Sequence, residues 1–127
     1  MITDRVGDFI IRLKNAGAIN EEKITVPYSA HLERVAKKLK ELEFVADVAK
    51  NERDLLVTLS YDERGVHKIK GVKRISKPGR RLYVGARNAH SVRNGAGARV
   101  LSTPKGILSD KEARTVKQGG ETLFEIW

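Results

Sequence analysis

Hydroxyl and ammonium groups gather in one short stretch of this chain, residues 102–106, which reads Ser-Thr-Pro-Lys-Gly. These side chains could do two kinds of chemistry. Ser102 and Lys105 have the S-x-x-K spacing with which some hydrolases pair a nucleophilic serine and a lysine. Alternatively, the hydroxyls of Ser102 and Thr103 and the charge of Lys105 could bind phosphates, ribose hydroxyls or base edges.

The surrounding sequence favours binding over catalysis. The S-D-N and K-T-G elements that accompany S-x-x-K in penicillin-binding enzymes are absent, and no histidine has a carboxylate and a nucleophile in a recognisable arrangement. Gly106 suits a binding loop, because a residue without a side chain lets the backbone approach a ligand closely. We therefore predict that the protein is not an enzyme and has no catalytic residue.

The positive charge of the chain lies almost entirely in its second half. The net charge is +9, but residues 1–62 carry 10 basic and 11 acidic side chains, whereas residues 63–127 carry 15 basic and 5 acidic ones. From Arg64 to Ser109 there are 12 Lys or Arg residues and no Asp or Glu. A surface that serves only solubility normally mixes both signs. The segment therefore indicates a surface for a polyanion, with nucleic acid as the first candidate.

Several classes of protein are excluded by what the sequence lacks. It has no cysteine and three scattered histidines, so we expect no disulfide, no metal site and no cofactor. No apolar run approaches the roughly 20 residues that span a bilayer, and the N-terminus is too amphipathic and too acidic for a signal peptide. We expect a soluble cytoplasmic protein with no membrane partner.

The first half of the chain is predicted to alternate helices and strands. Apolar residues at helical spacing after Thr3 or Asp4 predict a first helix that Gly17 ends. Ser29 is the expected cap of a second, amphipathic helix. Alternating apolar residues predict three strands, at residues 23–27, 44–49 and 55–61.

The second half is predicted to be mainly β. Residues 67–75 and 80–84 read as a hairpin, whose turn has Pro78 and Gly79 where a type II turn prefers them. The hairpin would display a set of cations together: Lys68, Lys70, Lys73, Arg74, Lys77, Arg80 and Arg81. The remaining expected elements are a loop and two strands, at residues 85–97, 98–102 and 121–127.

One short helix is expected within the second half. Ser109 and Glu112 form a capping box for residues 110–117, and Gly119-Gly120 ends this helix. The chain is therefore predicted to be α+β, with an α-β-α-β-β lobe packed on a mainly β, basic lobe. The two lobes are residues 1–64 and residues 65–127.

Three further polar residues, Glu121, Arg12 and Asn15, could either contact nucleic acid or simply be solvated. Glu121 repels phosphate, so in a basic surface it could accept a hydrogen bond from a base amino group, or it could simply begin a solvated strand. Arg12 and Asn15 lie on the polar face of the first helix, where the pattern alone favours solvation. Tyr83 is the only aromatic residue of the basic segment, and no helix-turn-helix or zinc finger is present. Structured RNA, read by shape and 2′-hydroxyls, is therefore favoured over other nucleic acids.

The order and spacing of these motifs resemble the family of small-subunit ribosomal protein eight, a universal primary rRNA binder. Residues 102–106 resemble its S-T-S-x-G loop, and residues 73–83 fit its central hairpin closely. The rest of the resemblance is carried by residues along the whole chain: Asp4, Asp8, Arg12, Asn15, Pro27, Ser29, Asp110, Glu112, Ala113, Arg114, Gly119, Gly120, Glu121 and Trp127.

The resemblance implies a structural constituent of the small ribosomal subunit that recognises a helix with an irregular core in the central domain of the rRNA and helps to assemble the platform. The RNA core would be contacted by Ser102, Thr103, Pro104, Lys105, Gly106, Gly120 and Glu121, supported by Tyr83, Lys77, Arg80, Arg81 and Arg74. Arg12 and Asn15 would contact a second rRNA segment. Neighbouring small-subunit proteins and, in some bacteria, the protein's own messenger RNA would be further partners.

Four residues depart from the family pattern. Pro104 stands where a second Ser is usual, which removes one hydroxyl and one N–H. Ala30 and Leu32 stand where lysines are usual, which predicts a weaker contact by the N-terminal lobe. Glu43 replaces a usual Gly, which predicts a different end for the second helix.

Two other functions stay open from the sequence: an RNA regulator that acts outside the ribosome, and a small hydrolase using Ser102 and Lys105.

Overall fold

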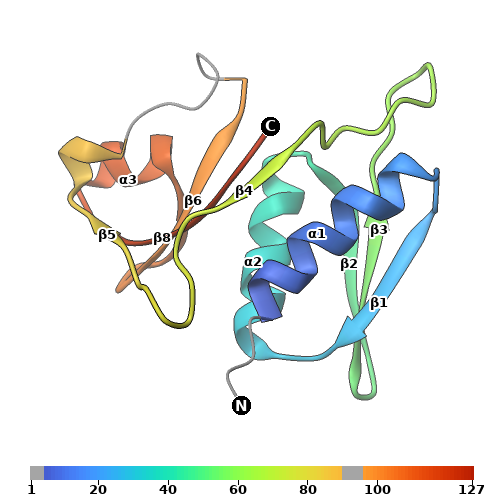
Figure 1. Ribbon diagram of the computed structural model, residues 1–127, viewed down its shortest axis with the longest axis horizontal. Helices are drawn as coiled ribbons and strands as arrows, with labels where there is room; N and C mark the ends of the chain where they lie inside the picture. The colour runs from blue at the N-terminus through green and yellow to red at the C-terminus, as the bar shows by residue number, and fades with distance from the viewer. Residues whose placement is uncertain (1–4, 90–95) are drawn as a thin grey trace. The chain divides into compact units, whose positions relative to one another are not determined.

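The computed structural model describes residues 5–89 and 96–127, which form two compact units (Figure 1). One unit is residues 8–70, and the other is residues 71–127 together with residues 5–7. In this division, the segment after Gly65 stays bound to the unit of residues 8–70. Its Lys68 N–H donates to the carbonyl of Ser60 over 3.0 Å, and Ile69 is buried.

The unit of residues 8–70 is a three-stranded antiparallel sheet with two helices, in the predicted α-β-α-β-β order. Its elements are α1 (Arg5–Ala18) apart from residues 5–7, β1 (Lys23–Pro27), α2 (Ala30–Glu41), β2 (Val45–Asn51) and β3 (Asp54–Leu59). The strand order is β1-β3-β2, and every second residue of the central strand β3 is buried. The apolar stripes of α1 and α2, including Leu13 and Leu39, are buried as well. One face of the sheet therefore shares a core with the two helices.

The C-terminal end of α2 has the geometry that glycine usually provides. Glu43 has a left-handed φ of 68°, and its N–H donates to the Lys40 carbonyl over 3.0 Å. The next N–H, of Phe44, donates to the Leu39 carbonyl over 2.9 Å. These two bonds are those of a Schellman motif, which satisfies the last carbonyls of a helix. The prediction of a different helix end at Glu43 was therefore wrong: the helix ends as a glycine would end it.

Replacing Glu43 by glycine is expected to stabilise the protein. A residue with a Cβ is strained in the left-handed conformation, whereas glycine adopts it freely but loses more backbone entropy on folding. We expect Glu43→Gly to raise the free energy of unfolding by about 0.5–1 kcal/mol in urea denaturation. Glu63→Gly, at an exposed turn residue without positive φ, is the matched control and should give no gain. Equal effects of the two changes would contradict the assignment.

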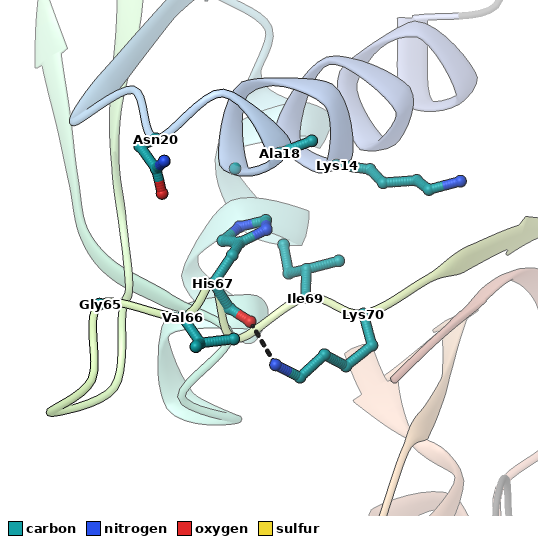
Figure 2. Close-up of a pocket in the computed structure, with 9 residues that line it drawn as sticks. Lys14, Ala18, Asn20, Gly65, Val66, His67, Ile69 and Lys70 are labelled. Atoms are coloured by element: carbon teal, nitrogen blue, oxygen red, sulfur yellow. Dashed lines mark hydrogen bonds between the residues drawn. The ribbon is translucent and has the colours of Figure 1, made fainter.

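Gly17 lies inside α1, which continues to Ala18, so the prediction that it ends the helix was wrong. A Cβ at Gly17 would lie 1.7 Å from Nδ1 of His67. Figure 2 shows the imidazole of His67 facing this turn of the helix. Glycine is required here because the ring of His67 packs directly on the backbone of α1, which holds the segment after β3 against the helix.

His67 is expected to make the stability of this unit depend on pH. Burial, and secondarily the charge of Lys70, lower the pKa of His67 below its usual 6.5. The unfolded chain therefore binds a proton more readily than the folded one, so stability falls as pH drops below about 6.5. Urea denaturation between pH 7.5 and pH 5 should show a smaller loss for His67→Phe than for the wild type. A His67→Phe protein that loses as much stability as the wild type between these two pH values would refute this role of His67.

The unit of residues 71–127 is a mainly β structure with one short α-helix. Its elements are β4 (Val72–Arg74), β5 (Tyr83–Val84), a 3-10 helix η1 (Ala86–Asn88), β6 (Ala98–Thr103), β7 (Gly106–Ser109), α3 (Asp110–Val116) and β8 (Gly120–Ile126). The strand order is β4-β8-β6-β7, with β5 also paired to β8. This composition confirms the predicted α+β class. No helix in the described ranges is long and apolar enough to cross a membrane.

The predicted hairpin of residues 67–84 does not form. β4 and β5 pair with different parts of the same edge of β8 and not with each other. The backbones of Lys77 and Arg80 bridge the two arms at the tip, each N–H donating to the other's carbonyl over 2.9 Å. Gly79 has no positive φ, so this turn is not of type II. Both arms pair with β8 because this strand offers a longer partner edge than either arm offers the other.

The capping box of α3 is confirmed. Ser109 Oγ accepts from the Glu112 N–H over 3.2 Å, and the Ser109 N–H donates to the Glu112 carboxylate over 3.1 Å. The helix runs to Val116, within one residue of the predicted end, and its C-cap is Lys117, whose φ is 58°, rather than a glycine.

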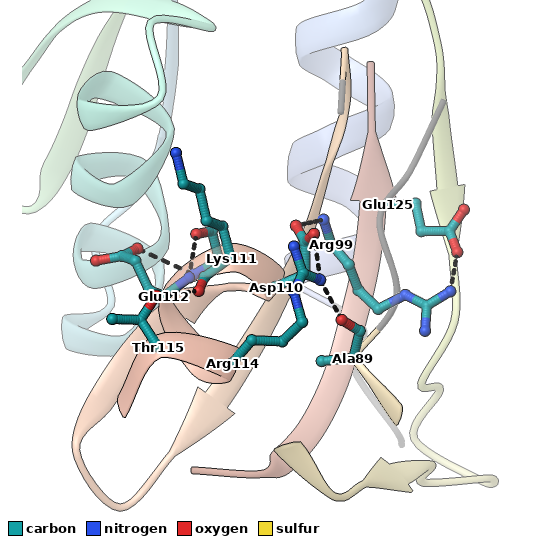
Figure 3. A network of polar contacts seen from close by, with 9 residues as sticks. Ala89, Arg99, Asp110, Lys111, Glu112, Arg114, Thr115 and Glu125 are labelled. Atoms are coloured by element: carbon teal, nitrogen blue, oxygen red, sulfur yellow. Dashed lines mark hydrogen bonds and ion pairs between the residues drawn. The ribbon is translucent and has the colours of Figure 1, made fainter. Parts of the chain in front are cut away.

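Polar contacts fix α3 on the sheet (Figure 3). The buried carboxylate of Asp110 accepts from the Arg99 N–H over 2.9 Å and from the Arg114 guanidinium over 3.0 Å. The Arg114 guanidinium also donates to the Ala89 carbonyl, and Arg99 pairs with Glu125 of β8 over 2.6 Å. Of the predicted loop at residues 85–97, residues 86–88 form η1, and residues 90–95 lie outside the described part.

Candidate nucleic-acid interface

Three predicted site residues from distant parts of the chain form one row across the C-terminal sheet. Glu121 on β8 pairs with Ser102 on β6 and, on its other side, with Tyr83 on β5. Residues directly opposite each other in antiparallel strands project from the same face. Tyr83 is 70% exposed, whereas the side chain of Glu121 is 17% exposed. The row therefore combines an exposed aromatic ring with a largely shielded carboxylate and a half-buried hydroxyl.

Residues 102–106 form a tight hairpin turn between β6 and β7, a strand that was not predicted. Thr103 pairs with Gly106, which leaves Pro104 and Lys105 exposed at the tip. The Thr103 hydroxyl donates to the Gly106 carbonyl over 2.7 Å and accepts from the Lys105 N–H over 3.1 Å. Gly106 has a φ of 107°, which favours glycine. The turn is thus held from inside by one hydroxyl and presents a cation.

Pro104 is compatible with this turn. It is the first of the two tip residues, where the fixed φ of proline is favoured. The Thr103 hydroxyl bonds to the residues after Pro104, so the turn does not depend on an N–H at position 104. The change from the usual serine therefore leaves the shape of the turn intact and removes only a hydroxyl from its exposed tip.

Gly119 and Gly120 allow close contact between backbones at the start of β8. A Cβ at Gly120 would lie 2.2 Å from the Ser102 carbonyl oxygen, and one at Gly119 would lie 2.3 Å from the Val84 carbonyl oxygen. Neither backbone atom can move aside without breaking a strand pair. The two glycines therefore set the position of Glu121 between its neighbours on β5 and β6.

The carboxylate of Glu121 is held by two side chains of the loop between β4 and β5. The Ser76 hydroxyl donates to Glu121 Oε2, and the Arg81 guanidinium donates to the same oxygen over 3.1 Å. Ser76 is fully buried, whereas the side chain of Arg81 is about half exposed. Ser76 was missed in the sequence because its S-K-P-G context reads as a turn. The only signal was its small polar side chain next to alternating apolar residues.

The predicted cations differ in their surroundings. Lys77 and Arg80 are exposed at the tip of the loop between β4 and β5, where they suit phosphate binding. Arg74 is half-buried and donates to the Leu123 carbonyl over 3.1 Å, so it also fastens β4 to β8. Arg81 donates its hydrogen bond to the Glu121 carboxylate. Lys77 and Arg80 of the loop therefore face outward, whereas Arg81 of the loop and Arg74 of β4 make structural contacts.

Arg12 and Asn15 belong to the other unit and are both exposed on α1. The Arg12 guanidinium donates to the Thr25 carbonyl of β1 over 2.9 Å. Of the two positions where lysines are usual, Ala30 is exposed and Leu32 is buried in the core. A contact of this unit with RNA stays a prediction.

The whole chain has relatives of known class. The family model for ribosomal protein S8 matches residues 4–127. The chain is similar to "Small ribosomal subunit protein uS8" of Nitratidesulfovibrio vulgaris (strain DSM 19637 / Miyazaki F), with 42% identity over 127 residues and 100% of both chains covered. The proteins of the same name from Persephonella marina and Thermus aquaticus are 40% and 39% identical, again with 100% of both chains covered. This chain therefore belongs to the ribosomal protein S8 family.

Proposed function

We propose that this protein is a structural constituent of the small ribosomal subunit, located with it in the cytoplasm. It binds the rRNA directly, at a helix with an irregular core in the central domain, and helps to assemble the platform. Membership of the family supports the general role, since relatives that match over their full length carry the name of a small-subunit protein. No chemical step is required of it, and Ser102 and Lys105 act by binding.

The observation that carries the proposal is the row of Tyr83, Glu121 and Ser102 beside the turn at residues 102–106. The row offers a ring for stacking, an acceptor for base amino groups and a hydroxyl for either base or ribose. Lys105 at the turn adds a positive charge for a phosphate. Side chains that can contact bases and a side chain that can contact the phosphate backbone thus lie on one sheet, which suits recognition of an irregular RNA helix.

Further contacts complete the proposal. Lys77 and Arg80 bind phosphates, while Arg81 and Arg74 support the surface on which the RNA lies. Arg12 and Asn15 on α1 contact a second rRNA segment. Neighbouring small-subunit proteins share the assembled site. The protein's own messenger RNA binds the same surface where it mimics the rRNA helix.

The salt dependence of binding tests whether the exposed cations contact phosphates. In filter binding to an rRNA fragment that contains the helix and its core, log Kd should vary linearly with log salt concentration. The double variant Lys77→Ala/Arg80→Ala should lower the slope by roughly 1.4–1.8, which corresponds to two lost phosphate contacts.

Lys37→Ala is the matched control, because Lys37 is an exposed cation on α2 of the other unit. It should leave the slope unchanged. An unchanged slope for the double variant would mean that the loop cations do not contact phosphate. No preference of the wild type for the fragment over a scrambled RNA would contradict the proposed function itself.

A further inference from the structure

The Ser76 hydroxyl links two parts of the candidate interface. Its side chain lies in the loop between β4 and β5 and is fully buried. The hydroxyl oxygen accepts from the Leu82 N–H over 3.2 Å, and the hydroxyl donates to Glu121 Oε2. One side chain therefore ties the neck of the loop that carries Lys77 and Arg80 and also holds the carboxylate of β8.

The direction of these bonds is fixed by chemistry. A backbone N–H can only donate, so the Ser76 oxygen accepts from Leu82, and a carboxylate can only accept, so the single hydroxyl proton goes to Glu121. The backbone repeats the arrangement: the Ser76 N–H donates to the Thr122 carbonyl over 3.1 Å, and the Thr122 N–H donates to the Leu82 carbonyl over 2.9 Å. The loop neck is thus clamped on β8 next to Glu121.

Within the described part of the chain, the side-chain bonds from Ser76 and Arg81 to the Glu121 carboxylate converge on one of its two oxygens. Both described partners of Glu121, Ser76 and Arg81, bond to Oε2. Among the residues that the structure describes, neither of these side chains bonds to Oε1. Since Arg81 and Ser76 are donors, they keep the carboxylate in one orientation within a basic surface.

We propose that Ser76 is a positioning residue that sets the Glu121 carboxylate to accept from the exocyclic amino group of an RNA base and keeps it in register with the phosphate-binding loop. The inference rests on the proposed function and extends it to a residue that does not itself touch the RNA. Loss of the hydroxyl frees the Glu121 carboxylate to rotate and loosens the neck of the loop. The carboxylate and the phosphate-binding cations of the loop are then no longer held in fixed positions relative to each other.

A double-mutant cycle in filter binding to the rRNA fragment tests this role. Ser76→Ala should weaken binding about tenfold in the wild-type background, and by less than about twofold when Glu121 is already alanine, because the two residues act as a unit. Ser60→Ala, which removes a hydroxyl from the other unit, should have no effect in either background. Circular dichroism melting of each variant verifies that it is folded at the assay temperature.

A second measurement distinguishes positioning from general stabilisation. Replacing individual guanosines by inosine, or adenosines by purine riboside, removes one exocyclic amino group at a time. At one position the wild type should lose affinity about tenfold, whereas Ser76→Ala and Glu121→Ala should lose little further. Additive effects in the cycle, or equal losses for all three proteins at every position, would overturn the role of Ser76. Failure of the wild type to prefer the fragment over scrambled RNA would instead overturn the proposed function.

Discussion

Gly120→Ala is expected to destabilise the protein by about 2–3 kcal/mol. The added Cβ would lie 2.2 Å from the Ser102 carbonyl oxygen and 2.9 Å from the Thr103 methyl group. The carbonyl is a backbone group of β6, which pairs with β8 at this point, so the clash forces the two strands apart. Urea denaturation should show a lower midpoint, and the same separation should weaken binding of the rRNA fragment.

Gly79→Ala is the matched control for this prediction. Gly79 lies in the loop tip without a positive φ, and a Cβ added there would have no heavy atom within 4 Å beyond its chain neighbours. Its substitution should change the free energy of unfolding by less than about 0.5 kcal/mol. A Gly120→Ala protein as stable as the control would show that β6 and β8 do not approach each other as closely as described.

Thr103→Ala and Glu121→Ala are each expected to weaken binding of the rRNA fragment by about 1–3 kcal/mol. The reasons differ. Thr103 holds the turn through bonds to Gly106 and Lys105, so its loss lets the tip move. We propose that Glu121 supplies an acceptor for the RNA in the middle of the row, so its loss should remove that bond. Filter binding at constant salt concentration measures both changes.

Thr115→Ala and Glu41→Ala are the controls for this pair. The Thr115 hydroxyl bonds to the Lys111 carbonyl within α3, away from the row, and Glu41 pairs with Lys38 on α2. Both controls should bind the fragment like the wild type. Wild-type affinity of both Thr103→Ala and Glu121→Ala would mean that the RNA does not contact the turn and the row.

Local signals predicted the helices well because the groups that start a helix are close in sequence. The capping residues Ser29 and Ser109 do what their positions indicated. The helix ends were less predictable, because Glu43 and Lys117 take left-handed conformations that sequence rules reserve for glycine. Gly17 was assigned to a helix end, although its missing side chain serves contact with a histidine far along the chain.

Strand pairing was the weakest part of the prediction, since a partner far along the chain competes with the neighbour. The segments that became β4 and β5 alternate like a hairpin, yet both pair with β8. The same distant pairing assembles the candidate site: Tyr83, Ser102 and Glu121 meet only through β8. The residue types were enough to predict these three residues as site members. The contact of the buried Ser76 with Glu121 could not be predicted, because the two residues meet only in the folded chain.

Sedimentation of the protein from a cell lysate through a sucrose gradient tests the proposed ribosomal role most directly. We predict that an epitope-tagged chain sediments with the small ribosomal subunit and stays with it at a salt concentration that removes loosely bound factors. A chain that is found only at the top of the gradient would contradict this role and would favour an RNA regulator that acts outside the ribosome.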